Sequence, residues 1–555
     1  MSVPTAASES GAEPYRPPEL TGLADLLDEG LRQRPENRAL VIGEDRVPLT
    51  YRSLAGLAER VATRLGAEGL RSGDAVALTG ANTVEFVVTL LASARAGLVV
   101  APLDPALPEP EMSARLRALG ARVVVVGAPT PEAVPAGRGT EAAPDGQGSE
   151  ATPVGQGPEA APGGQGPVPG WTLRIDAPRA GRVNATLDTG GRAAHRVRGA
   201  APGLSAEDAL VLFTAGTTDR AKMVPLTHAN VAASVRGICT GYELEPTDAT
   251  VAVMPLFHGH GLLAGLLAPL AAGACVLLPA RGRFSAHTFW DDVRAAGATW
   301  FTAVPTIHEI LLERAAREYP GPLLAPLRFV RSCSAPLTVA TGRALERTLG
   351  APVLSAYGMT ESTHQATSQR LPGRGVPKRG SVGRTTGVEL RIVGPDGKDR
   401  APGTVGEVWV RGPTVTRGYL GDPAETARGF TDGWFHTGDL GSLDRDGDLF
   451  LTGRIKDLIN RGGEKISPEH VEDVLSGCPG VTEAAVFPVP DATYGQRVGA
   501  AVVTRDGADT GRILAYCRAR LAPYEVPDRL EIAHALPHTA KGALDRQAVV
   551  ERYAR

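Results

Sequence analysis

Residues 73–105 read GDAVALTGANTVEFVVTLLASARAGLVVAPLDP, and this stretch decides the fold class. An apolar strand, a turn, an apolar helix and a second apolar strand follow one another. This order is typical of a β-α-β unit in a buried parallel sheet. The stretch therefore predicts an α/β fold, with mixed parallel sheets and flanking helices in a large N-terminal domain.

A chain of 555 residues with 43% hydrophobic content is long enough for two or three separate cores. The pattern changes near residue 455, and SPEHVEDVL, which starts at Ser467, predicts a helix. Ser467 can cap this helix and Pro468 fits its first turn. We therefore expect an N-terminal domain over 1–455 and a small α+β domain over 456–555.

Residues 127–170 form a segment of different composition, rich in Gly, Pro, Ala and Glu, in which GQG recurs at 146, 155 and 164. Such a segment cannot bury enough apolar surface to offset the entropy lost on ordering. We interpret it as a disordered insertion between elements of the N-terminal domain.

Charge and composition favour a cytoplasmic protein. A formal net charge of -3 and a pI near 6.4 provide no general attraction to nucleic acid or to an anionic membrane. The first twenty residues lack the basic start and apolar stretch of a secretion signal, and no apolar run approaches the roughly twenty residues of a membrane span. The five cysteines lie far apart without a Cys-x-x-Cys pair, so we expect reduced thiols rather than disulfides or zinc.

The first chemical motif is LFTAGTTDRAKMVPLTH at 212–228, where an apolar strand runs into a loop of small hydroxyl residues with a Gly and a Lys. Such a loop can direct N–H groups and hydroxyls at phosphate oxygens. It lacks the Walker pattern, and a Thr- and Gly-rich loop taken alone is more often only a turn.

Three further stretches give this loop a context: SAYGMTESTHQ (355–365), GWFHTGDLG (433–441) and LTGRIKDLINRGGEKISPEHVEDVL (451–475). With the loop, and in this order, they resemble the adenylate-forming superfamily of acyl-CoA synthetases, peptide-synthetase adenylation domains and luciferases. The resemblance implies a β-subdomain, a mobile C-terminal domain, and a two-step reaction. ATP activates a carboxylate as acyl-AMP with release of pyrophosphate, and the acyl group then passes to the thiol of coenzyme A.

The resemblance also implies a nucleotide site. The residues that match the phosphate loop are Thr214, Gly216, Thr217, Thr218 and Lys222. The matches in the other motifs are Tyr357 for adenine stacking, Thr360 for the α-phosphate, Glu361 for Mg²⁺, Asp439 for the ribose hydroxyls, Arg454 near ribose and phosphate, and Lys456 at the domain hinge.

Within the superfamily, stretches such as MPLFHGHGLLAGLLAPL and FVRSCSAPL resemble the oxalyl-CoA synthetase branch, which implies oxalate as substrate. Ser334 and His364 match the oxalate contacts of that branch, and a buried second carboxylate needs such donors. His364 could equally be a satisfied histidine beside the nucleotide. His258 and His260 could suggest a metal pair, but they have no third ligand, and in the family such a His lines the acyl pocket. The alternative acids are a short or medium-chain fatty acid and an aryl acid.

The chain departs from the superfamily at two places. In the phosphate loop Ala215, Asp219, Ala221 and Met223 replace the usual residues, and a carboxylate beside a triphosphate should weaken ATP binding. In ALPHTAKGALDRQ (535–547), Ala543 stands where the family has its catalytic lysine.

Lys541 lies two residues before Ala543, about 6.6 Å away in an extended segment, so it could replace the lysine only in part. Our candidate catalytic residues are Lys541, Thr360, Glu361 and His258.

Three functions are consistent with these observations. The first is an acyl-CoA synthetase, slowed if Lys541 replaces the missing lysine only in part. The second is an adenylating domain that serves a carrier protein, and the third is a degraded homologue that binds nucleotide or acyl-CoA without turnover. We expect a monomer or a homodimer, with a small carboxylic acid, ATP, Mg²⁺ and coenzyme A as ligands, and no nucleic acid.

Overall fold

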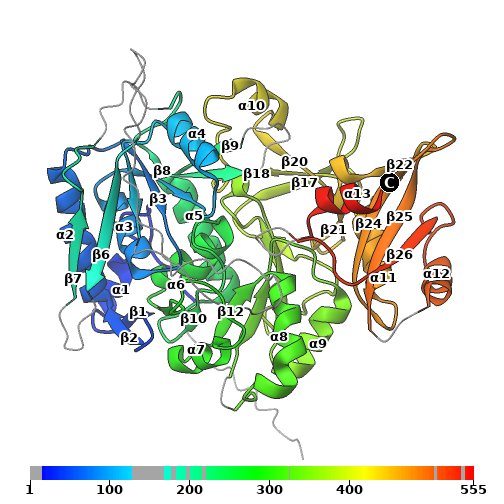
Figure 1. Ribbon diagram of the computed structural model, residues 1–555, viewed down its shortest axis with the longest axis horizontal. Coiled ribbons are helices and arrows are strands. Elements are labelled where there is room, and N and C mark those ends of the chain that lie inside the picture. The colour runs from blue at the N-terminus through cyan, green and yellow to red at the C-terminus, as the bar shows by residue number, and fades with distance from the viewer. Residues whose placement is uncertain are drawn as a thin grey trace, which may run out of the picture.

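The predicted β-α-β unit lies at the centre of the largest sheet (Figure 1). The computed structural model describes residues 15–127, 168–176, 183–194, 201–214, 221–323, 326–505, 509–538 and 544–554. In these residues the largest sheet has seven strands, in the spatial order β7 (Asn184–Asp188), β6 (Gly170–Asp176), β5 (Val123–Val126), β3 (Ala75–Thr79), β4 (Val99–Leu103), β8 (Asp208–Thr214) and β9 (Lys222–Thr227).

Helix α3 (Val84–Arg95) connects β3 to β4, and the two strands pair in parallel, as residues 73–105 predict. The side chain of Thr83 accepts a hydrogen bond from the Phe86 N–H and caps the helix. Every residue of β3 and β4 is buried, which explains their continuous apolar sequence.

The predicted insertion at 127–170 falls between neighbouring strands of this sheet, because β5 pairs in parallel with β6 from Val124 and Gly170 onward. Gly170 is the first residue of β6, so the insertion ends before it. Residues 128–167 lie outside the described part of the chain.

A second sheet carries or leads into several of the predicted site residues. Its strands are β12 (Trp300–Ala303), β13 (Phe329–Ser332), β14 (Val353–Tyr357), β15 (Thr367–Ser368) and β16 (Arg384–Thr385). The first three are parallel, and the carboxyl ends of β13 and β14 lead directly to Ser334 and to the motif that begins at Ser355. In open α/β sheets, ligands bind at this edge.

Two smaller sheets complete the region before residue 455. One has the order β10 (Ala249–Val251), β11 (Cys275–Leu277), β1 (Arg38–Ile42) and β2 (Val47–Thr50). The other is largely antiparallel and contains β17 (Glu389–Val393), β18 (Gly406–Arg411), β20 (Trp434–Leu443), β19 (Phe430–Thr431) and β21 (Leu449–Arg454). The remaining helices here are α1 (Asp28–Gln33), α2 (Tyr51–Ala67), α4 (Glu109–Leu119), α5 (His228–Tyr242), α6 (Ala268–Ala271), α7 (Phe289–Ala296), α8 (Pro305–Glu318), α9 (Val339–Leu349) and α10 (Pro423–Gly429).

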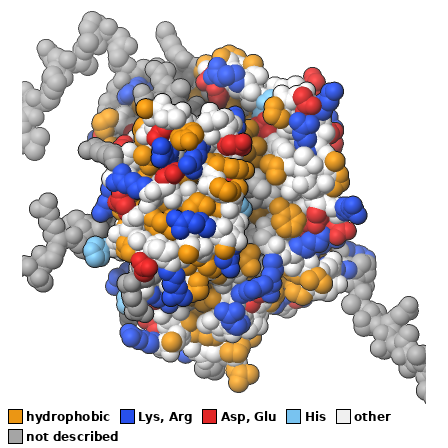
Figure 2. Space-filling model, turned by 90° about the vertical axis from the view of Figure 1, so that its right-hand side faces the viewer, with side chains coloured by type: hydrophobic (Ala, Val, Ile, Leu, Met, Phe, Trp, Pro, Cys, Tyr) orange, Lys and Arg blue, Asp and Glu red, His pale blue; other side chains and the backbone are white. Residues whose placement is uncertain are grey.

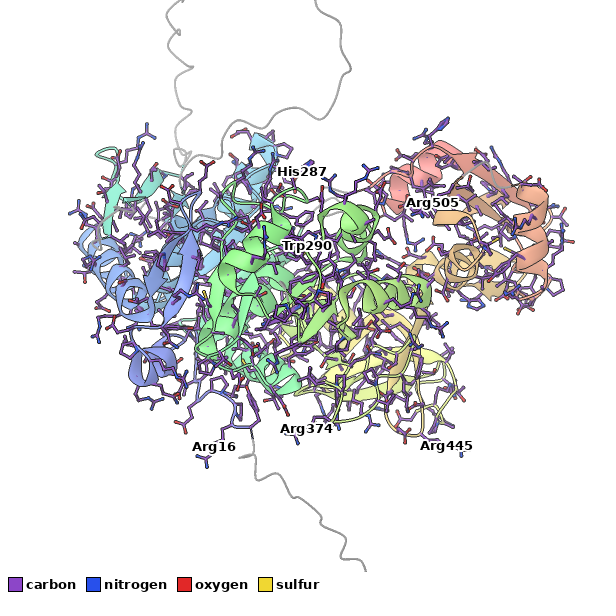
Figure 3. All side chains as sticks on the ribbon, turned by 90° about the horizontal axis from the view of Figure 1, so that it is seen from below. Arg16, His287, Trp290, Arg374, Arg445 and Arg505 are labelled. Atoms are coloured by element: carbon purple, nitrogen blue, oxygen red, sulfur yellow. The ribbon has the colours of Figure 1, made fainter. Side chains whose placement is uncertain are left out.

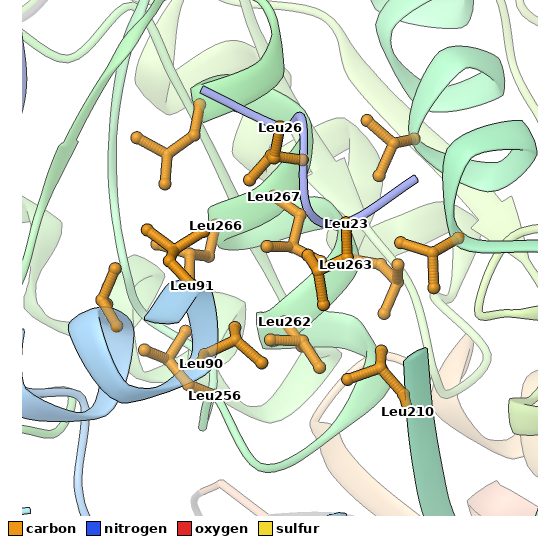
Figure 4. Packing of buried hydrophobic residues seen from close by; sticks show 14 of the residues in the cluster. Leu23, Leu26, Leu90, Leu91, Leu210, Leu256, Leu262, Leu263, Leu266 and Leu267 are labelled. Atoms are coloured by element: carbon orange, nitrogen blue, oxygen red, sulfur yellow. The ribbon is translucent and has the colours of Figure 1, made fainter. Parts of the chain in front are cut away.

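A leucine core lies under the segment that contains FHGHG. Residues His260–Leu267 form a π-helix, η1, and all eight of them are buried. Figure 4 shows its leucines packed among others from distant segments, including Leu23, Leu90 and Leu210. π-helices are rare and are frequently found at functional sites, so the position of His260 at the first residue of η1 marks it as a candidate site residue.

Residues after 455 pack around cores of their own, drawn from residues 459–554. Their sheet contains β23 (Glu464–Ile466), β22 (Ile459–Arg461), β25 (Gly495–Thr504), β24 (Val481–Asp491) and β26 (Arg529–Ala533), with α11 (Pro468–Ser476), α12 (Thr510–Arg518) and α13 (Arg546–Tyr553). Figure 3 shows this group, marked by Arg505, at one end of the molecule. The predicted cap is present, since the Ser467 side chain accepts a hydrogen bond from the His470 N–H.

The cysteines, the helix lengths and the surface charges bear on the predictions of reduced thiols and of no membrane span. All five cysteines are buried and unpaired. Within the part of the chain that the structure describes, no helix combines the length and the apolar character needed to cross a bilayer. On the face in Figure 2, basic and acidic side chains are interspersed among uncharged ones.

Candidate active site

The motif at 355–365 connects two groups of polar side chains. Tyr357 ends β14, Thr360 and Glu361 form the short 3-10 helix η2 (Thr360–Ser362), and His364 follows in the left-handed region at φ 78°. Gly358 permits this path, because a Cβ atom there would lie 1.7 Å from the carbonyl oxygen of His364. One short loop therefore presents the predicted adenine, phosphate, metal and acid contacts together.

The first group surrounds Asp439, which is 4% exposed. The hydroxyl of Tyr357 donates to its Oδ2 at 2.6 Å, and Nε of Arg454 lies 2.8 Å from its Oδ1. Asp439 and Arg454 face each other across β20 and β21. Burial raises the pKa of Asp439, while Arg454 and the Tyr357 hydroxyl oppose this shift. Each carboxylate oxygen has a second lone pair, so both can still accept a hydrogen bond from a ligand.

The second group contains Glu361 and Lys222. The hydroxyl of Tyr419 donates to Oε1 of Glu361 at 2.9 Å, and burial raises the pKa of this carboxyl. Nζ of Lys222 lies 4.9 Å from the centre of the Tyr419 ring and pairs with the carboxylate of Glu425. Lys222 also faces Thr214 across β8 and β9. The arrangement places an ammonium near the ring of Tyr419 and a half-buried carboxylate at its hydroxyl.

Glu361 suits Mg²⁺ that arrives with a nucleotide. A buried carboxylate is costly without a cation, and Mg²⁺ in such sites uses one or two carboxylates together with substrate phosphates. Among the described residues no cluster of three or more His, Cys, Asp or Glu could hold a metal ion by itself. Among the described residues Glu361 is the predicted metal ligand, and phosphate oxygens would have to supply further ligands.

The third group is built on Arg331 of β13, whose side chain is completely buried. Its guanidinium donates to the hydroxyls of Tyr242 and Thr302, both at 3.0 Å. It also contacts Nε2 of His260 at 3.2 Å and Nε2 of His364 at 3.0 Å. The two imidazole rings stack with centroids 5.1 Å apart. Burial is the first cause that lowers the pKa of both histidines, and Arg331 lowers it further.

Ser334 joins this group through His260, since its Oγ lies 3.0 Å from Nδ1 of that ring. Ser334 is exposed and has a φ of 72°. Ser334, Thr363 and His364 are three of the six described non-glycine residues with positive φ. Such strain persists where the surrounding structure enforces it, and it concentrates at functional sites.

Of the predicted site residues that the structure describes, most lie in these groups. Asp439, Tyr357 and Arg454 meet, as do Glu361 and Lys222, and Ser334 and His364 share one network. Four described candidates remain. Thr214 lies opposite Lys222 on the neighbouring strand, and Thr360 is on the same loop as Glu361. His258 is half-buried two residues before His260, with its ring against Phe257, and Lys456 is in the short 3-10 helix η3 (Ile455–Asp457) between β21 and β22.

Several predicted residues lie outside the described part of the chain. They are Ala215, Gly216, Thr217, Thr218 and Asp219 of the phosphate loop, and Lys541 and Ala543 near the C-terminus. The assignments of these residues stay predictions.

The sequence analysis missed Arg331, Tyr242, Thr302 and Tyr419. One signal was available for Arg331. In FVRS the arginine lies in a strand whose four positions are all buried. A charged residue in a fully buried strand requires partners, which is a reason to search for a site there.

The comparisons with known proteins define the class. The sequence model of the AMP-binding enzyme family matches residues 27–420, and that of the AMP-binding enzyme C-terminal domain matches residues 470–543. The chain is 42% identical over 538 residues to an oxalate–CoA ligase of Arabidopsis thaliana, covering 96% of this chain and 98% of that one. It is 41% identical to a probable CoA ligase of Humulus lupulus, covering 96% of both chains.

Among solved structures, ATP-bound MatB from Rhodopseudomonas palustris superposes with a TM-score of 0.77 at 28% identity, covering 97% of this chain and 99% of that one. Fold, site and relatives together define an ATP-dependent, AMP-forming acid–CoA ligase, whose cofactors are ATP, Mg²⁺ and coenzyme A. The chain belongs to the AMP-binding enzyme family.

Proposed function

We propose that the acid activated by this enzyme is oxalate. The observation that carries the proposal is the network of Arg331, His364 and Ser334, in which polar groups and a buried positive charge meet at the predicted acid pocket. A small dicarboxylate leaves one carboxylate inside the protein while the other reacts, and that buried anion needs hydrogen-bond donors and positive charge. Oxalate–CoA ligases from Arabidopsis thaliana and Saccharomyces cerevisiae are each 42% identical to the matched part of this chain.

The same network argues against the alternative acids. Arg331 and the two imidazoles are already buried, so an apolar acyl chain could neither balance the buried positive charge nor accept a hydrogen bond from Ser334 or His364. The relatives agree, because a feruloyl-CoA synthase of Amycolatopsis and a long-chain-fatty-acid–CoA ligase of Mycobacterium tuberculosis are only 31% and 29% identical.

For the nucleotide, we assign the ribose to Asp439 and the adenine to the Tyr357 ring. Their mutual hydrogen bond at 2.6 Å supports this pairing, because it holds carboxylate and ring in one arrangement before ATP arrives. Arg454 would lie beside the ribose and phosphates, since it already pairs with Asp439.

The triphosphate is assigned to Lys222, Thr360 and the loop residues Thr214, Gly216, Thr217 and Thr218. Lys222 is paired with Glu425 in the structure, so phosphate oxygens would have to compete with that carboxylate for the ammonium. Glu361 would hold Mg²⁺, which supplies charge neutralisation on the phosphates when it is bound. His258 would lie by the reacting carboxylate, in the segment that leads into η1.

We also propose that residues 456–555 rotate about Lys456 between the two half-reactions. The separate core of residues 459–554 and the short η3 connection around Lys456 support a hinge at this point. In one orientation of residues 456–555, Lys541 would approach the α-phosphate. In the other orientation, a different face of the same residues would admit coenzyme A. Because the catalytic lysine position is Ala543, adenylation should be the slower half-reaction.

The experiment is pyrophosphate release from ATP across a panel of acids, with mass detection of the acyl-CoA product. Oxalate should give the highest kcat/KM and yield oxalyl-CoA. A preference for a fatty or aryl acid would refute the proposal. Nucleotide binding with no pyrophosphate release from any acid would indicate the degraded homologue, and transfer to a carrier protein but not to coenzyme A would indicate the carrier-dependent enzyme. The expected monomer or homodimer and the cytoplasmic location are proposals that sedimentation and cell fractionation would test.

A further inference from the structure

Arg331 is a buried cation whose partners in the described residues are all neutral. It is 0% exposed, and its hydrogen bonds go to Tyr242, Thr302, Gln365 and two histidines rather than to a carboxylate. A buried charge is normally paired with an opposite charge, because the loss of hydration is otherwise uncompensated. The protein therefore maintains a positive charge in contact with His364, a predicted acid contact, and with His260, which bonds Ser334.

The guanidinium also determines where the histidines carry their protons. Arginine has only donors, so Nε2 of His364 must accept the hydrogen bond from Arg331 at 3.0 Å. The same holds for Nε2 of His260, at 3.2 Å from the guanidinium and 2.6 Å from the Thr302 hydroxyl. A neutral imidazole that accepts at Nε2 carries its proton on Nδ1. Both rings are thus Nδ1–H tautomers.

The two Nδ1–H groups are the donors that these rings can offer. Nδ1–H of His260 donates to Oγ of Ser334 at 3.0 Å, which leaves the Ser334 hydroxyl proton available for another acceptor. Nδ1 of His364 makes no hydrogen bond to a residue in the described part of the chain. The positive φ values of Ser334 and His364 show that the backbone is held in an unfavourable conformation at both donors.

Building on the proposed oxalate activity, we propose that Arg331 is a positioning residue that makes the enzyme select acids with a second negative charge. It holds His260 and His364 as Nδ1–H tautomers, so that the Ser334 hydroxyl and the His364 N–H donate to the carboxylate that does not react. Its own charge offsets the charge of that carboxylate. A monocarboxylic acid of similar size has no second carboxylate to accept these hydrogen bonds or to be offset by the charge of Arg331.

The test compares oxalate with acetate and glycolate in the wild type, in Arg331→Gln and in the control Tyr242→Phe. The control removes one hydrogen bond from the same guanidinium, at Nε, and leaves both histidine contacts in place. In Arg331→Gln the ratio of kcat/KM for oxalate to that for acetate should fall about a hundredfold, mainly through KM, because the buried carboxylate loses its charge partner. In Tyr242→Phe the ratio should stay unchanged. An equal loss for all three acids in folded Arg331→Gln would overturn the inference.

A measurement on the wild type covers the case in which Arg331→Gln does not fold. Nitrogen-15 NMR of labelled histidines, assigned with His260→Gln and His364→Gln, should show both rings as neutral Nδ1–H tautomers. A proton on Nε2 of either ring would contradict the inference without any Arg331 variant.

The outcomes also separate this inference from the proposed function. If the wild type prefers a different dianionic acid, the choice of oxalate fails and the role of Arg331 stands. If the wild type uses oxalate and Arg331→Gln keeps the wild-type ratio, the role of Arg331 fails alone. A wild type that accepts only monocarboxylic acids would refute both.

Discussion

Replacing Asp439 by alanine should abolish tight ATP binding and leave the fold intact. In the proposed complex its two oxygens accept from both ribose hydroxyls, and each hydrogen bond to a charged acceptor contributes about 1.5–3 kcal/mol. The loss of two such bonds is about 3–6 kcal/mol, which raises the Kd for ATP at least about a hundredfold. Calorimetric titration of ATP into the wild type and Asp439→Ala would measure the change.

The structure also predicts that the fold tolerates this substitution. The side chain of Arg454 is 51% exposed, so it can turn to water when its partner is removed. Only the Tyr357 hydroxyl loses a buried partner, at a cost of about 1–3 kcal/mol.

A matched control is Asp448→Ala. Asp448 is also a buried aspartate that pairs with an arginine, Nε of Arg384 at 3.1 Å from its Oδ2, but it has no proposed role in nucleotide binding. Its loss should cost stability without changing the Kd for ATP. Unchanged ATP affinity in folded Asp439→Ala, or an equal loss of affinity in the control, would refute the ribose assignment.

Three further predictions concern other parts of the chain. Ala543→Lys should raise the rate of adenylation up to about a hundredfold and leave transfer from a preformed acyl-adenylate unchanged, because a positioned charge acts only on the phosphate chemistry; if Lys541→Ala stops adenylation and Ala543→Lys changes nothing, Lys541 is the catalytic lysine. Deletion of residues 128–167 should leave solubility and kcat nearly unchanged, whereas aggregation would show that the segment packs against the protein. Burial lowers the pKa of His308 to about 4. At a pH below the ordinary pKa of histidine, the unfolded chain therefore takes up a proton at this residue that the native chain does not. Stability should therefore fall as the pH decreases from 7 to 5, by about 2 kcal/mol at this residue. Urea titrations should show a smaller fall in His308→Gln, and equal falls in both proteins would exclude His308 as the cause.

Much of the fold could be predicted because its signals are local. The β-α-β unit was expected from residues 73–105 and is present as β3, α3 and β4. The helix after Ser467 was expected from its cap and from Pro468, and it spans Pro468–Ser476. Burial of a strand or a helix face imposes a short period on the sequence, which can be recognised without knowing what lies against it.

The candidate site was predictable only where short motifs contain it. Tyr357, Glu361 and His364 belong to one stretch, and Asp439 and Arg454 belong to two others, so a resemblance that covers these stretches was enough to select them. The π-helix at His260 and the left-handed backbone of Ser334 left no comparable signal. Both conformations are unfavourable for the isolated segment, and the packing around them maintains them.

The sequence by itself thus determined the order of the elements, the family and the residues of the nucleotide motifs, because each depends on residues close together in the chain. Only the tertiary structure decided the partners of Arg331. Its acceptors come from positions 89, 71 and 29 residues earlier, at Tyr242, His260 and Thr302, and 33 and 34 residues later, at His364 and Gln365. A buried guanidinium is tolerated only where several acceptors meet at one point, and strands and helices far apart in the sequence create that point when they pack.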